Sequence, residues 1–104
     1  MAAAKAKFTL SARADLAEIK RYSLEQWGPL QAKSYLHTIK QATELLAEQP
    51  RLGKARPDIK INAYSFPVKS HVIYYLAYPE YITVFAVLGE SMLPKPHLET
   101  RLTN

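Results

Sequence analysis

The spacing of hydrophobic positions along the chain changes once, near residue 50. Before that point, apolar residues recur three and four positions apart, which is the period of one face of an α-helix. After it, short apolar and aromatic runs are separated by turn residues, a pattern typical of β-strands. The pattern therefore predicts an α+β fold with a helical first half and a β-rich second half.

The chain begins with a short alternating segment. Residues 7–10 alternate polar with apolar, which predicts a strand. Ser11 then occupies a position expected for a helix N-cap, and Asp15 and Glu18 lie early enough to favour the positive end of the helix. The predicted helix carries on one face Ala12, Leu16, Ile19, Ser23 and Trp27.

Gly28-Pro29 separates this helix from a second one. Gly suits a C-terminal cap and Pro suits the first turn of the next helix. The second helix ends before Pro50 and carries on one face Ala32, Tyr35, Leu36, Ile39, Ala42, Thr43 and Leu46. Because the connection is so short, the two helices are expected to pack antiparallel as a helical hairpin.

Three strands are predicted to follow the helices. Residues 51–58 contain Gly53 and Pro57 and are expected to form a loop. The strands are predicted at 59–68, 71–78 and 81–88, and the short step between the last two favours a hairpin.

The predicted order is therefore a strand, a helical hairpin, an antiparallel meander of three strands and a short tail. The tail is polar and broken by Pro94 and Pro96, and residues 98–102 suit a final short helix. Layered together, the hairpin covers one sheet face and leaves the other partly open, which gives a partner room to dock.

Length and composition narrow the possible classes of protein. The 104 residues fit one domain, 1–104, and the absence of cysteine excludes disulfides, zinc–thiolate sites and a cysteine nucleophile. The start of the chain does not resemble a signal peptide, and no run approaches the roughly 20 apolar residues of a membrane span, so we expect a cytoplasmic protein without membrane contact. The net charge of +5 favours an acidic protein or a nucleic acid as partner.

Residues suited to catalysis are sparse. No serine lies in a nucleophile elbow, and the three glycines form no phosphate-binding loop. His37, His71 and His97 have no partner at metal-ligand spacing, and we expect His71 to be a structural hydrogen-bonding residue. We therefore predict no catalytic residue, no cofactor and no metal.

Basic residues gather in the predicted loop. Arg51, Lys54, Arg56 and Lys60 lie within ten positions, and Lys69 follows closely. They are either ordinary solvated loop charges or a positive rim beside the open sheet that receives carboxylates or phosphates.

Aromatic residues gather in the β-rich half, where the chain carries Tyr64, Phe66, Tyr74, Tyr75, Tyr78, Tyr81 and Phe85. Most are expected to be core residues or cross-strand pairs, and the others give the outer face a hot-spot character. Stacking on unpaired bases is the alternative. Protein contact is favoured, because basic residues do not alternate with the tyrosines.

Four stretches form an ordered set of motifs across nearly the whole chain. They are LSARADLAEI at 10–19 followed by Tyr22, Trp27-Gly28 and Gln31-Ala32; LAEQP at 46–50 followed by Leu52-Gly53; FPV at 66–68 followed by SHVIYY at 70–75; and ITVFAVL at 82–88 followed by ESM at 90–92 and HL at 97–98. In this order they resemble the ParE/RelE toxin superfamily. The Tyr…Trp-Gly and Ser-His-Val-Ile-Tyr-Tyr pieces resemble its ParE branch in particular.

This resemblance implies a RelE/ParE-like fold and the toxin of a type II toxin–antitoxin system, with a role in plasmid maintenance. Such a toxin is neutralised in a hetero-oligomeric complex by a ParD-like antitoxin, whose disordered segment folds on it, and inhibits DNA gyrase by protein binding. No direct DNA binding by the toxin alone is expected. We expect the toxic surface on the hairpin and tail, with the antitoxin in the groove beside them. The predicted contact residues are Trp27, which also fits the core, and Arg56, Tyr64, Lys69, His71 and Tyr74.

Departures from the family pattern bear on enzymatic activity. Residues 86–89 read Ala-Val-Leu-Gly where many members carry Arg-Val-Leu-His, and residues 91–104 contain no tyrosine. Residues 64–67 also lack the sheet arginine of many relatives, a departure that bears on antitoxin contact and on toxicity rather than on catalysis. RNA cleavage needs groups that activate the 2′-hydroxyl and stabilise the phosphorane, and the missing arginine and histidine are the residues best suited to these roles. A RelE-like ribosome-dependent mRNA endonuclease is therefore the second hypothesis. An inert antitoxin-binding relative is the third.

Overall fold

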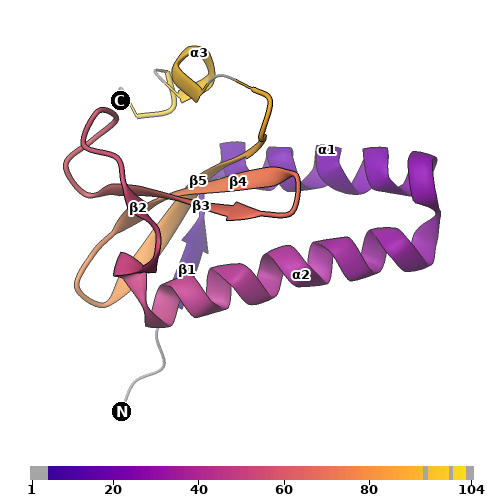
Figure 1. Ribbon diagram of the computed structural model, residues 1–104, viewed down its shortest axis with the longest axis horizontal. Coiled ribbons are helices and arrows are strands. Elements are labelled where there is room, and N and C mark those ends of the chain that lie inside the picture. Colours follow the sequence, from indigo (N-terminus) through magenta and orange to yellow (C-terminus); the bar gives the residue numbers. More distant parts are fainter. Residues whose placement is uncertain (1–4, 93, 99, 103–104) are drawn as a thin grey trace.

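The protein consists mainly of a helical hairpin and a five-stranded sheet, followed by a short C-terminal helix; the computed structural model describes residues 5–92, 94–98 and 100–102. The elements, in order, are β1 Lys5–Phe8, α1 Leu10–Trp27, α2 Pro29–Glu48, the 3-10 turn η1 Pro50–Leu52, β2 Lys54–Ala55, β3 Ala63–Val68, β4 His71–Ala77, β5 Tyr81–Gly89 and α3 Pro94–Leu98. Figure 1 shows α1 and α2 running antiparallel and extending past the sheet at their joined ends. The predicted α+β class is confirmed. Residues 1–4, part of the segment in which no signal peptide is predicted, lie outside the described residues.

The strand order of the sheet is β1-β5-β4-β3-β2. The antiparallel meander of β3, β4 and β5 is confirmed, and β1 adds to it parallel to β5, with Lys5 opposite Tyr81. The loop predicted at 51–58 is wrong in part, because it contains η1 and the two-residue strand β2, which pairs with Tyr64 and Ser65 of β3. So short a strand has no alternation that a sequence pattern can reveal.

β3 begins four residues later than predicted. The chain turns between Arg56 and Ala63, where the Arg56 amide donates to the Ala63 carbonyl at 2.8 Å and the Ala63 amide donates to the Lys60 carbonyl at 2.9 Å. The apolar Ile59, which suggested a strand, instead packs half-buried against the core.

The start of α1 corrects the prediction for Ser11. Thr9 is the N-cap, with its Oγ1 accepting from the Ala12 amide at 3.1 Å, and the Thr9 amide still donates to Val84 of β5 at 3.0 Å. One residue thus ends the strand pairing and begins the helix, so α1 starts at Leu10. As a result, Asp15 lies beyond the first turn and does not support the helix end.

The junction between α1 and α2 is as predicted. Gly28 adopts φ +87°, a backbone conformation that favours glycine, and its amide donates to the Leu24 carbonyl at 3.1 Å. Pro29 then opens α2, where its missing amide hydrogen costs no helical hydrogen bond.

The two helices cover one face of the sheet. This helix-side core contains Ala12, Ile19, Ile39, Leu46, Ala47, Val68, Ile73, Tyr75, Ile82, Val84 and Val87. Trp27, also predicted on the inner face of α1, remains 47% exposed, because it lies at the end of the helix beyond the sheet.

The other sheet face is less open than predicted. Its tail-side core contains Ala63, Tyr74, Leu76, Phe85, Ala86, Leu88 and Leu98, with Leu102 packed against it. A bulge in β5 contributes to this layer: Tyr74 faces Ala86 and Tyr75 faces Val84, so Phe85 is the extra residue. The bulge places Phe85 and Ala86 on the same face.

The short helix of the tail lies earlier than predicted. α3 spans Pro94–Leu98 rather than 98–102. Pro94 and Pro96, which suggested a broken segment, fall in its first turn, where proline is tolerated.

Candidate protein-interaction surfaces

Four ring side chains form an aromatic row that links the helical hairpin to the sheet. The Tyr22 and Trp27 rings lie edge to face with centroids 6.2 Å apart, and the Trp27 and Tyr35 rings follow at 6.1 Å. The Tyr35 ring meets the His71 ring at 5.6 Å. Tyr22 is 51% exposed and Trp27 is 47% exposed, so the outer half of the row faces solvent.

The inner end of the row is fixed by hydrogen bonds. The Tyr35 hydroxyl lies 2.6 Å from Nδ1 of His71 and 3.2 Å from Oγ of Ser70. Burial lowers the pKa of His71, and the charge of Glu90 opposes that shift. The neutral imidazole is therefore favoured, and His71 joins α2 to β4 as the hydrogen-bonding residue that was predicted.

Arg56 and Tyr74 lie together on the tail side of the sheet. The Arg56 guanidinium is 5.8 Å from the centroid of the Tyr74 ring and donates to both carboxylate oxygens of Asp58, at 3.1 and 3.0 Å. These bonds raise the pKa of Arg56. Tyr74 is only 4% exposed and packs against Phe85, so it offers a partner little surface.

The remaining two predicted contact residues lie elsewhere. Tyr64 stacks on Tyr75 at 5.5 Å on the helix side. Lys69 is exposed in the turn between β3 and β4, with φ 58°, directly before Ser70 and His71 in the chain. The structure therefore brings Trp27 and His71 into one row with Lys69 close in sequence, and separates them from Arg56, Tyr74 and Tyr64.

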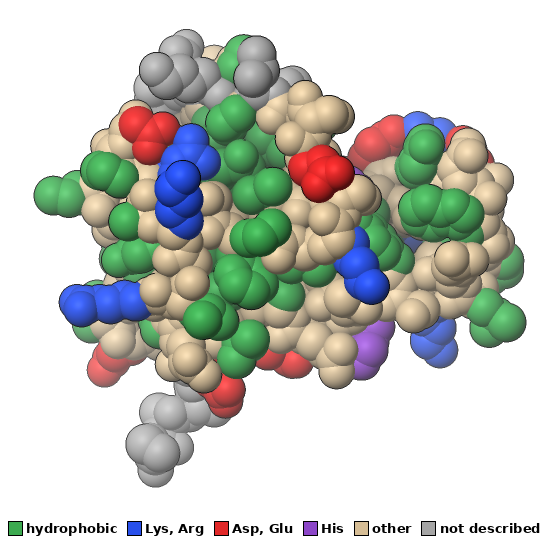
Figure 2. All heavy atoms as spheres, viewed as in Figure 1, with side chains coloured by type: hydrophobic (Ala, Val, Ile, Leu, Met, Phe, Trp, Pro, Cys, Tyr) green, Lys and Arg blue, Asp and Glu red, His purple; other side chains and the backbone are tan. Residues whose placement is uncertain are grey.

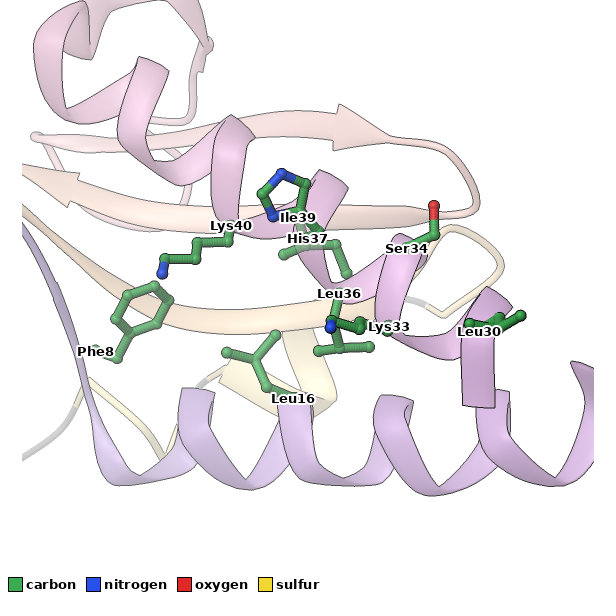
Figure 3. Close-up of a pocket in the computed structure, with 9 residues that line it drawn as sticks. All are labelled: Phe8, Leu16, Leu30, Lys33, Ser34, Leu36, His37, Ile39 and Lys40. Atoms are coloured by element: carbon green, nitrogen blue, oxygen red, sulfur yellow. The ribbon is translucent and has the colours of Figure 1, made fainter. Parts of the chain in front are cut away.

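A groove between α1 and α2 was missed by the sequence analysis. It has a volume of about 800 Å³ and is lined by Phe8, Leu16, Leu30, Lys33, Ser34, Leu36, His37, Ile39 and Lys40. We call it the hairpin groove. In Figure 3, Leu16 and Leu36 point toward each other across it, and Phe8 closes it at β1.

The walls of the hairpin groove are mostly apolar, and both Lys33 and Lys40 are exposed. Leu30 is 87% exposed in the first turn of α2. Such an apolar residue off the buried face of a helix is a sequence signal for this surface, although the groove itself depends on how the helices are spaced.

The described residues offer neither a metal site nor a membrane-spanning helix. Among the residues that the structure describes, no group of three or more His, Cys, Asp or Glu side chains could hold a metal ion. No helix in the described ranges is long and apolar enough to cross a membrane.

The hairpin-on-sheet architecture, with an apolar groove and an exposed aromatic row, defines a RelE/ParE-like α+β protein. The family model "ParE toxin of type II toxin-antitoxin system, parDE" matches residues 6–94. The chain belongs to this ParE toxin family.

The proteins similar to this chain include ParE toxins and a chain from a ParDE system, in agreement with the family model. Toxin ParE1 of Caulobacter vibrioides (strain ATCC 19089 / CIP 103742 / CB 15) is 31% identical over 87 residues, which cover 84% of this chain and 90% of that toxin. Toxin ParE1 of Mycobacterium tuberculosis (strain ATCC 25618 / H37Rv) is 32% identical over 83 residues, covering 79% and 85%. A chain of the solved structure "Chromosomal ParDE TA system from P. aeruginosa" has the same fold, with a TM-score of 0.70, 18% identity and coverage of 84% of this chain and 96% of that chain.

Proposed function

We propose that this ParE-family toxin is held inactive by a ParD-type antitoxin and, when released, inhibits DNA gyrase by binding it, without catalytic chemistry of its own. The observation that carries the proposal is the open hairpin groove on a chain of this family. A structural neighbour from a ParDE system supports the choice of a ParD-type partner.

The hairpin groove suits an amphipathic helix. An apolar trough between two helices accepts side chains three and four residues apart on a third helix. Lys33 and Lys40 beside the trough and the net charge of +5 favour a helix that also carries acidic residues. A disordered acidic segment of the antitoxin would fold as it binds there.

A protein-binding mode of action fits the described side chains better than RNA cleavage. His71, the histidine of the aromatic row, has its Nδ1 hydrogen-bonded to the Tyr35 hydroxyl, and its lowered pKa disfavours the protonated form. The end of β5 carries Ala86 and Gly89 rather than an arginine and a histidine. Groups to stabilise a phosphorane are therefore sparse along this strand.

A supercoiling assay with purified gyrase tests the proposal. The chain is expected to inhibit supercoiling, and equimolar antitoxin to restore it. In cells, induced expression is expected to give filamentation with DNA-damage signalling. Full gyrase activity in the presence of the toxin, together with rapid translation arrest and cleaved transcripts, would contradict the proposal and favour an endonuclease.

A charge-reversal pair tests the antitoxin site. Lys33→Glu combined with Lys40→Glu is expected to weaken antitoxin binding about tenfold or more, measured by calorimetry. Lys54→Glu combined with Lys60→Glu makes the same change of net charge at exposed positions away from the groove and is the matched control. Equal losses in both variants would mean that net charge or the basic loop of Lys54 and Lys60, and not the groove, determines the affinity.

A further inference from the structure

Exposed apolar side chains gather at the end of the molecule where α1 meets α2. Nine large hydrophobic residues are exposed in the described part of the chain, and four of them lie between positions 22 and 30: Tyr22, Leu24, Trp27 and Leu30. Figure 2 shows hydrophobic side chains on this end of the hairpin, at the right of the view. Such a concentration beyond the sheet contributes nothing to the sheet's core and marks an interaction surface.

We infer that the aromatic row of Tyr22, Trp27, Tyr35 and His71 is the surface that engages the toxin's target, separate from the groove that holds the antitoxin. Its partner is an acidic protein surface that presents an apolar side chain to Trp27. The inference rests on the proposed function and specifies which face of the toxin carries it.

The row is preorganised for binding. Each ring is held edge to face by the next, and the Tyr35 hydroxyl is tied at 2.6 Å to His71 at the start of β4. Ordering side chains at an interface opposes association, so rings already fixed in place lose less entropy when a partner binds. Trp and Tyr are also the residues most enriched where interface energy concentrates.

The net charge of the chain favours an acidic partner, whereas the charges beside the row largely cancel one another. Glu18 and Glu25, the acids nearest to Tyr22 in the sequence, are both bonded to Arg21. Lys69, next to Ser70 in the chain, is exposed and has no ion pair with any described residue. The negative charge of Glu90 near His71 offsets the positive charge of Lys69, but the chain as a whole has a net charge of +5.

The row and the hairpin groove are distinct but adjacent. None of the four ring residues lines the groove, so each surface can be altered separately. Leu30 and Lys33, which line the groove, follow Trp27 by only three and six positions. A helix seated in the groove therefore lies close enough to exclude a bulky target from the row, which would account for neutralisation by steric exclusion.

The decisive experiment compares two double variants of the full chain. Tyr22→Ala with Trp27→Ala is expected to weaken gyrase inhibition about tenfold or more, while antitoxin affinity stays within about twofold of wild type. Leu52→Ala with Ile61→Ala also removes two exposed apolar side chains, from the region around β2, and is expected to leave both properties unchanged. Circular dichroism melting confirms that each variant is folded.

A third variant tests preorganisation itself. Tyr35→Phe keeps the ring and removes the hydroxyl that holds His71. Inhibition is expected to fall about threefold, less than for the double variant, with antitoxin affinity retained.

Failure of the inference and failure of the proposed function give different experimental results. If wild-type toxin inhibits gyrase and Tyr22→Ala/Trp27→Ala inhibits equally well, the inference is wrong and the proposed function stands. A parallel loss of antitoxin binding would assign the row to the antitoxin, and a row-dependent affinity for single-stranded RNA with unchanged inhibition would assign it to nucleic acid; either result overturns the inference. Wild-type toxin without effect on gyrase overturns the proposed target, and the inference with it.

Discussion

The two faces of the sheet are covered in different ways. On the helix side, two long helices bury apolar residues at regular spacings, and most of that layer is visible in the sequence pattern. On the tail side, the cover is the short α3 with Leu98 and Leu102. So small an element buries little apolar area and depends on specific polar contacts to stay in place.

An ion pair between Asp15 of α1 and Arg101 of the tail holds the tail against the sheet. β1 pairs with β5 only as far as Val84. Beyond that point the Val87 amide donates to Asp15 Oδ2 at 2.9 Å, and Arg101 donates to the Phe85 carbonyl at 3.0 Å. Arg101 also binds both carboxylate oxygens of Asp15, at 2.6 and 3.0 Å. Side chains thus satisfy the strand edge where β1 ends, and the same bonds hold the tail.

The largest loss of stability is expected when the ion pair between Asp15 and Arg101 is broken. Asp15→Ala leaves the mostly buried Arg101 guanidinium without its carboxylate and the Val87 amide without its acceptor. The free energy of unfolding is expected to fall by about 4 kcal/mol, measured by urea denaturation. Glu18→Ala, which breaks an exposed ion pair on the same helix, is the control and should have no measurable effect. Equal stabilities for the two variants would show that the tail is not held by Asp15.

A second pair of variants compares the two layers directly. Leu46→Ala removes a fully buried side chain of the helix side and is expected to cost about 3 kcal/mol. Leu98→Ala on the tail side is expected to cost about 2 kcal/mol, because a short element can shift to close the cavity.

Hydrogen exchange separates the two variants further. Leu46→Ala should lower protection throughout the sheet, whereas Leu98→Ala should lower it chiefly in β5 and the tail. Uniform loss in both variants would contradict a division of the core into two layers of unequal rigidity.

The sequence could predict the features that neighbouring residues determine, but not the contacts that distant residues form. The hairpin, the Gly28-Pro29 junction and the meander arise from local periodicity and turn chemistry, which act over a few residues. The ion pair between Asp15 and Arg101 joins positions 86 apart in the sequence, so no local pattern predicts it. The sequence analysis assigned Asp15 to the helix end instead. Likewise, the aromatic row was only partly predicted: Trp27 and His71 were named, but Tyr35, which connects them, was placed with the buried face of α2. The hairpin groove was missed because it depends on the distance between two helices.

The helix side also has a buried polar contact, which provides a smaller test. The Tyr75 hydroxyl donates to the Pro50 carbonyl at 2.6 Å and accepts from the Gly53 amide at 3.1 Å, and burial raises the pKa of Tyr75, which keeps it a donor. A side chain at Gly53 would collide with this hydroxyl, since an added Cβ would lie 2.5 Å from it. Tyr75→Phe should therefore reduce the free energy of unfolding by about 1–2 kcal/mol.

Tyr64→Phe is the control for this variant. It removes the hydroxyl of the ring stacked on Tyr75 without touching the Pro50 and Gly53 contacts. Thermal melts should show it close to wild type. A Tyr75→Phe variant as stable as Tyr64→Phe would mean that η1 and β2 are held by backbone pairing alone.

The smallest expected effect concerns the bond between Tyr35 and His71. Because the pKa of His71 in the folded protein lies below its ordinary value of 6.5, the unfolded chain binds a proton more readily as the pH falls below that value. The unfolded state then holds more protons than the native state, so stability should decline from about pH 6.5 down to the lower native pKa and stay level above pH 7. His71→Gln should flatten the decline in this window, whereas Asp15→Ala should shift the whole curve downward. A curve that is identical for wild type and His71→Gln would show that the link between α2 and β4 does not depend on the neutral imidazole.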